Sequence, residues 1–121
     1  MPIKKILVVD DSPTERLALS EVLVKNGFQV VTAESGDEAV VKSKSEHPDL
    51  ILMDVVMPGL NGFQLTRTIT RDPRWAAVPV IMCTSKNQQT DKVWGMRQGA
   101  RDYIVKPVNA DELIGKIKAF G

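Results

Sequence analysis

Several short apolar runs of this 121-residue chain end in residues that could take part in polar chemistry. Asp10 and Asp11 follow the first run, Asp54 follows another, and Thr84 and Lys106 come directly after two later ones. Carboxylate oxygens suit Mg²⁺, which takes few protein ligands and keeps several waters. A metal ion, an ammonium group and a hydroxyl can each hold one oxygen of a transferred phosphoryl group. With one carboxylate left as the nucleophile, this set of residues suits phosphoryl transfer to an aspartate.

The segments that would position these residues alternate between strand-like and helix-like patterns. Strands are expected at 6–9, 30–33, 50–53, 78–83 and 103–105, and helices at 12–26, 35–47, 61–71, within 88–98, and from 109 to the end. Ser12 to Glu15 and Ser35 to Glu38 have the spacing of capping boxes, and Pro13 suits a first helical position. This alternation predicts an α/β fold in three layers, an open parallel sheet covered by helices on both faces. In such a sheet, ligands bind beyond the carboxyl ends of the strands.

Residues 50–62 carry the clearest signal. Four apolar residues, 50–53, are typical of a strand buried on both faces, and Asp54 comes where that strand ends. Pro58, Gly59 and Gly62 follow at once and predict a sharp turn. The sequence therefore indicates that Asp54 is presented in a loop at the edge of the sheet.

Composition narrows the class of protein. The chain is 43% hydrophobic and 26% charged, with a net charge of +1, which gives no electrostatic reason to expect nucleic acid or an anionic membrane as partner. No run is long enough to cross a membrane, and the N-terminus has no signal-peptide pattern. The one cysteine, Cys83, lies in an apolar run and is expected to be a buried core thiol. We expect a cytoplasmic protein with residues 1–121 as a single domain.

Together these motifs resemble the receiver domain of two-component response regulators. The matching stretches are 8–12 (VVDDS), 52–62 (LMDVVMPGLNG), 83–85 (CTS) and 102–107 (DYIVKP), and the resemblance covers the whole chain. It implies the flavodoxin-like (βα)5 fold with strand order 2-1-3-4-5 and no output domain. Residues 94–107 further resemble stand-alone, chemotaxis-type (CheY-like) regulators of pilus-based motility.

The resemblance implies a role for each matching residue. Asp54 would be the phosphoacceptor, and Asp11 with Asp54 would ligate Mg²⁺, with Asp10 acting mainly through water. The backbone carbonyl of Val56 would complete the protein's share of the metal ligands. Lys106 and Thr84 would each bind a phosphoryl oxygen, and Tyr103 would follow Thr84 as a rotameric switch.

The same resemblance implies signalling rather than enzymatic turnover on other molecules, although the domain would assist its own phosphorylation and dephosphorylation. The phosphodonor would be the phosphohistidine of a histidine kinase. Phosphorylation would alter the face made by the fourth helix, fifth strand and fifth helix, and a downstream target protein would bind there. The chain would be a monomer or a weak dimer, without nucleic-acid binding or membrane insertion.

The same residues are compatible with other roles. Asp10 and Asp11 could be acids that favour a helix N-terminus, and Thr84 could be an ordinary loop hydroxyl. A phosphohydrolase with an aspartyl-phosphate intermediate would need an acid two residues after its nucleophile on the first strand, where this chain has Ser12. A flavin-binding module would need a glycine- and hydroxyl-rich loop there instead of two acids. A receiver-like scaffold that never uses phosphate is disfavoured by the complete set of acids, Thr84 and Lys106.

Overall fold

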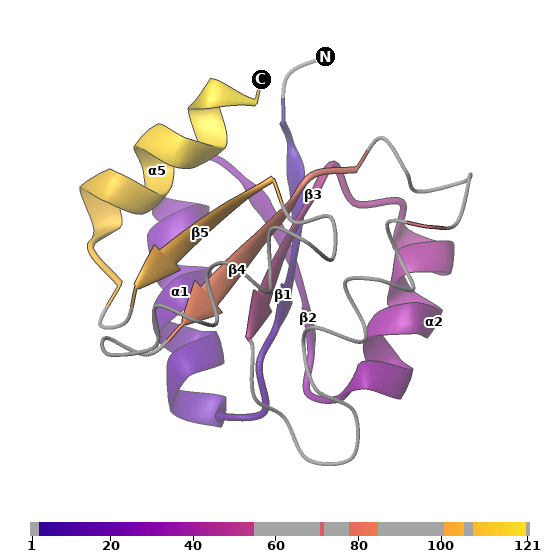
Figure 1. The fold of residues 1–121 in the computed structure, drawn as a ribbon. Coiled ribbons are helices and arrows are strands. Elements are labelled where there is room, and N and C mark those ends of the chain that lie inside the picture. The colour runs from indigo at the N-terminus through magenta and orange to yellow at the C-terminus, as the bar shows by residue number, and fades with distance from the viewer. Residues whose placement is uncertain (1–2, 55–70, 72–77, 85–100, 106–107, 121) are drawn as a thin grey trace.

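Five parallel strands form one sheet with the order β2-β1-β3-β4-β5 (Figure 1). The computed structural model describes residues 3–54, 71, 78–84, 101–105 and 108–120, with Thr84 described by its backbone alone. The strands are β1 Lys5–Val9, β2 Gln29–Ala33, β3 Leu50–Asp54, β4 Val80–Thr84 and β5 Asp102–Val105, and the described helices are α1 Pro13–Lys25, α2 Gly36–Glu46 and α5 Ala110–Ala119. The predicted α/β class and the flavodoxin-like strand order are confirmed. The helices expected at 61–71 and within 88–98 lie outside the described residues, apart from position 71.

The sheet has a separate apolar layer on each face, because alternate residues of a strand point to opposite sides. On one face, Leu7, Val9, Ile51 and Met53 pack with Ala39 of α2. On the other face, the alternate strand residues pack against α1 and α5 through Leu19, Leu23, Leu113, Ile114 and Ile117. Figure 1 shows α1 and α5 on one side of the sheet and α2 on the other, which gives the three layers predicted from the sequence. Cys83 is buried in the layer that contains α1 and α5, as expected.

The central strand, β3, is buried along its whole length, as its continuous apolar run predicts. It pairs with β1 on one side and with β4 on the other, and both pairs are parallel. The carboxyl ends of these three strands therefore meet at one edge of the sheet. Asp54 is the last residue of β3 and Thr84 is the last residue of β4.

Each described helix begins at a polar residue whose side chain accepts a backbone N–H of the first turn. Ser12 Oγ accepts from Glu15 at 3.3 Å, Ser35 Oγ accepts from Glu38 at 3.2 Å, and Asn109 Oδ1 accepts from Glu112 at 3.0 Å. Ser12 and Ser35 are the caps predicted from the sequence, α5 begins where a helix was expected, and Pro13 occupies the first turn of α1.

Two ends of elements show how local geometry sets the boundaries. The helix α1 ends at Lys25 with Asn26 as its C-cap, and the next residue, Gly27, has a φ of 91°, a conformation that glycine adopts without strain. The strand β4 starts at Val80, two residues later than the predicted 78, because Pro79 has no N–H to donate to the sheet. The Pro79 carbonyl still accepts the Ile51 N–H at 3.0 Å. Among the described helices, none has the length and apolar character needed to span a bilayer.

Candidate functional site

Asp10 and Asp54 lie next to each other at the carboxyl edge of the sheet. The β1–β3 register pairs Val9 with Met53, so the residue that follows Val9 stands beside the residue that follows Met53. Both aspartates are buried, with exposed fractions of 1% for Asp10 and 8% for Asp54. The site therefore begins with two carboxylates that the backbone register of the central strands brings together.

Three backbone contacts fix Asp10. Its N–H donates to the Ala33 carbonyl at 3.1 Å, which continues the pairing of β1 with β2 by one residue. Its Oδ1 accepts a hydrogen bond from the backbone N–H of Ser12 at 2.9 Å, and its backbone carbonyl accepts one from Nη1 of Arg16 at 2.7 Å. Arg16 also pairs with Glu34 at 3.7 Å. Both the backbone and the carboxylate of Asp10 are thus held against the start of α1.

Glu15 is a third carboxylate at this site. Carboxylate oxygens of Asp10, Glu15 and Asp54 all lie within 4.8 Å of one another, and Glu15 is half-buried. The sequence assigned Glu15 only to the capping box of the first helix. The signal that could have identified it is its position in the first turn of the helix that follows β1, because that turn lies at the carboxyl edge of the sheet.

Asp11, in contrast, is exposed and does not belong to this group of three carboxylates. It lies in the connection between β1 and α1, directly after the buried Asp10. Its role as a metal ligand stays a prediction. Val56 and Lys106, which complete the predicted site, lie outside the described residues.

Thr84 lies on β4, the strand next to β3, and Tyr103 lies on β5, the strand beyond it. Thr84 pairs with Val105 of β5, one residue beyond the Asp54–Cys83 pair. Tyr103 pairs with Met82, is half-buried, and packs against the apolar layer on the α2 face. The ammonium group of Lys116 on α5 lies 5.5 Å from the centre of the Tyr103 ring and 3.2 Å from Oδ1 of Asp102. These contacts connect Tyr103 to α5.

The charges at the carboxyl edge suit a divalent cation. Two unit charges 4.8 Å apart repel by about 3.5 kcal/mol at an effective dielectric constant of ~20, so buried neighbouring carboxylates need compensating positive charge. All the donors in the group are hard carboxylate oxygens, which Mg²⁺ prefers over the nitrogen and sulfur ligands of transition metals. The described residues therefore fit a Mg²⁺ site.

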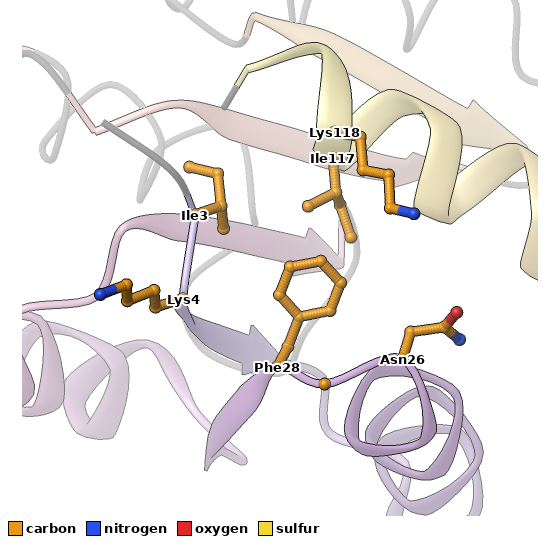
Figure 2. A pocket seen from close by; sticks show the side chains of 7 residues that line it. Ile3, Lys4, Asn26, Phe28, Ile117 and Lys118 are labelled. Atoms are coloured by element: carbon orange, nitrogen blue, oxygen red, sulfur yellow. The ribbon is translucent and has the colours of Figure 1, made fainter.

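A cavity of about 390 Å³ lies at the opposite edge of the sheet, near the start of β1. Figure 2 shows Phe28 and Ile117 between the side chains of Lys4 and Lys118, at the C-terminal ends of α1 and α5. The described residues that line this cavity include no carboxylate. It is separate from the aspartate site, which is at the other end of the strands.

Known proteins share this fold and much of this sequence. Residues 6–118 match the model of the response regulator receiver domain. The chain is 56% identical over 115 residues to Protein PilH of Pseudomonas aeruginosa, covering 95% of both chains. It is 39% identical to Protein PilG of the same organism, covering 95% of this chain and 85% of PilG.

Longer relatives match over part of their length. The phosphate regulon transcriptional regulatory protein PhoB of Escherichia coli is 41% identical over 116 residues, and the chain spans about half (51%) of PhoB. Among solved structures, the chemotaxis protein CheY4 of Vibrio cholerae superimposes with a TM-score of 0.91 at 31% identity, covering 98% of this chain and 99% of CheY4. The family match, the sequence relatives and the shared fold agree that the chain belongs to the family of response regulator receiver domains.

Proposed function

We propose that this domain accepts a phosphoryl group from the phosphohistidine of a histidine kinase onto Asp54. The observation that carries this proposal is the position of Asp54 at the end of the fully buried β3, with its carboxylate beside those of Asp10 and Glu15. Receiver domains take phosphate from histidine kinases and signal to downstream targets. In this chain, Asp54 would be the residue that takes the phosphate.

In the proposed reaction, a carboxylate oxygen of Asp54 attacks phosphorus and the bond between phosphorus and the histidine nitrogen breaks. The products are an acyl phosphate on Asp54 and the histidine side chain of the kinase, whose departing nitrogen keeps the electron pair and takes up a proton from solvent to give neutral imidazole. Asp10, Asp11, Asp54 and the carbonyl of Val56 would hold Mg²⁺. When bound, Mg²⁺ would supply positive charge that balances the carboxylates and the phosphoryl oxygens.

The remaining site residues bind and sense the phosphoryl group. Lys106 and Thr84 each hold one phosphoryl oxygen, and Thr84 is on the strand next to Asp54. The domain acts as a signalling module that assists its own phosphorylation and hydrolysis, by aligning the phosphoryl group and stabilising its charge.

The signal leaves through the face made by the segment within 88–98, β5 and α5. When the Thr84 side chain moves toward the phosphoryl group, the Tyr103 side chain moves with it. The contacts of Lys116 with Asp102 and with the Tyr103 ring couple this movement to α5. Phosphate can shift the populations of two conformations only as far as it binds them differently. Arg101, which is exposed just before β5, is a candidate contact for the target protein, as are Trp94 and Arg97.

The helix α1 is the proposed docking surface for the kinase. Leu17 and Val24 are 61% and 60% exposed, and they are seven residues apart, so they lie on the same side of the helix. Both residues are on the helix whose first turn carries Glu15 to the aspartate site, so a kinase bound to this helix would lie next to Asp54.

We further infer a cytoplasmic role in chemotaxis-like control of pilus motility, with the domain as a monomer or a weak dimer. This part of the proposal is supported by the similarity to PilH over 95% of both chains and by the similarity to PilG. The net charge of +1 is consistent with a protein target rather than nucleic acid.

A phosphotransfer panel tests the proposal. Radiolabelled histidine kinases from the source genome are mixed with the domain in Mg²⁺, and label is followed from each kinase to the domain. Rapid transfer from one kinase, lost in Asp54→Asn, is expected; no transfer from any kinase, or undiminished transfer to Asp54→Asn, would contradict the proposal. A second arm measures target binding by Arg101→Ala, which should weaken while phosphorylation stays normal.

A further inference from the structure

The capping box at the start of α1 is only half formed. Ser12 Oγ accepts the Glu15 N–H at 3.3 Å, as the motif requires. In a complete box, the Glu15 carboxylate would accept the N–H of Ser12, but that N–H donates to Asp10 Oδ1 at 2.9 Å. The Glu15 carboxylate lies instead with those of Asp10 and Asp54, within 4.8 Å.

The other described helices have a glutamate at the same position but use it differently. Glu38 of α2 pairs with Lys42 at 2.9 Å and accepts the Glu34 N–H at 3.5 Å, so its carboxylate is used within its own helix and the preceding loop. Glu112 of α5 is exposed to solvent. Each described helix thus has a glutamate three residues after its N-cap, and of these glutamates Glu15 is the one whose carboxylate lies in the aspartate site.

We propose that Glu15 is an outer carboxylate of the Mg²⁺ site and acts on the ion through a metal-bound water. This inference rests on the proposed function, because it assumes that Asp10 and Asp54 belong to the cation site. Mg²⁺ takes one or two carboxylates directly and keeps several waters, so a further carboxylate at this distance is placed to accept a hydrogen bond from one of them. Such outer groups orient the inner ligands and strengthen binding.

The consequence is a cation affinity above what the aspartates alone would give. Loss of an outer-shell partner typically weakens metal binding by 10- to 100-fold. Glu15 is half-buried, which reduces solvent screening relative to a surface acid but does not remove it. We therefore expect the lower end of that range, about tenfold, when its charge is removed.

The test compares Mg²⁺ binding by the wild type, Glu15→Gln and the matched control Glu112→Gln, without any phosphodonor. Both substitutions remove one carboxylate from the first turn of a helix and keep the side-chain size. Titration is followed by NMR shifts of the Asp10 and Asp54 amides and by calorimetry. A dissociation constant about tenfold higher for Glu15→Gln alone is expected. Equal affinities for all three proteins, or the same loss in Glu112→Gln, would overturn the role of Glu15.

A second readout separates a loss of binding from a general loss of stability. Mg²⁺ that binds the folded domain raises the free energy of unfolding by RT ln(1 + [Mg²⁺]/Kd), and the melting temperature rises with it. At one fixed Mg²⁺ concentration, Glu15→Gln should show a smaller rise than the wild type, and Glu112→Gln should show the full rise. A full rise in Glu15→Gln would also refute the inference.

Failure of this inference can be told apart from failure of the proposed function. If wild type binds Mg²⁺ and accepts phosphate on Asp54 while Glu15→Gln binds Mg²⁺ equally well, only the role of Glu15 is wrong. If wild type binds no Mg²⁺ at all, both the inference and the metal part of the proposed function are wrong.

Discussion

Replacing Asp54 by asparagine should stabilise the metal-free domain although the substitution abolishes the proposed phosphoacceptor. Asp54 and Asp10 are buried, and their carboxylate oxygens lie within 4.8 Å of each other. At an effective dielectric constant of ~20, that separation corresponds to about 3.5 kcal/mol of repulsion. Asp10 Oδ1 also accepts a hydrogen bond from the Ser12 N–H at 2.9 Å, which favours the charged carboxylate and offsets part of this energy. We therefore expect a net gain of about 1–2 kcal/mol, because asparagine keeps the shape of aspartate and removes its charge.

The assay is urea denaturation in EDTA and again in saturating Mg²⁺, with thermal melting as a second probe. For a domain of this size, 1 kcal/mol corresponds to a shift in melting temperature of roughly 3–5 °C. In EDTA, Asp54→Asn should be more stable than wild type. In Mg²⁺ the difference should shrink or reverse, because the ion stabilises the wild type more. The exposed Asp111 of α5 provides the control, and Asp111→Asn should not gain stability. An Asp54→Asn variant that is equally or less stable than wild type in EDTA would refute the repulsion argument.

Two further predictions concern the helix starts. Hydrogen bonding to Lys42, followed by smaller effects of Glu34 and Arg16, holds the pKa of Glu38 below its ordinary value of 4.5. The charge of Glu38 therefore stabilises the fold above that value, and Glu38→Gln should lower the free energy of unfolding by about 0.3–0.5 kcal/mol at neutral pH. In urea melts at falling pH, this difference between the two proteins should disappear as the pH passes through the lowered pKa. A difference that stays constant with pH would contradict the assignment. Ser12→Ala should lower the free energy of unfolding by about 1 kcal/mol in the same melts, since it removes the cap on the Glu15 N–H, and no change would show that the 3.3 Å contact contributes nothing.

Much of the fold follows from local patterns. The continuous apolar run 50–53 predicted a strand buried on both faces, and β3 is buried throughout. Ser12 and Ser35 predicted the starts of two helices, because each side chain can accept an orphan N–H of the first turn, and the helix expected from position 109 is also present. The start of β4 was placed two residues too early, because an apolar run does not show where N–H donors become available beside Pro79.

The site is only partly predictable, because it depends on tertiary proximity. In the sequence, Asp10 and Asp11 are equivalent neighbours, whereas in the structure Asp10 is buried and Asp11 is exposed. The direction in which the chain leaves β1 decides whether Asp10 or Asp11 lies beside Asp54. Glu15 was assigned to a capping box, and the competition of Asp10 for the Ser12 N–H could not be seen from spacing alone.

Chemical trapping can show whether Asp54 is the residue that carries the phosphoryl group. The domain is phosphorylated with acetyl phosphate in Mg²⁺ and treated with borohydride, which reduces an aspartyl phosphate to homoserine. Peptide mass spectrometry then locates the reduced residue. We predict homoserine at position 54 only when both phosphodonor and Mg²⁺ are present. Homoserine at position 10 or 11 instead, or no reduced residue in protein that has taken up phosphate, would contradict the claim.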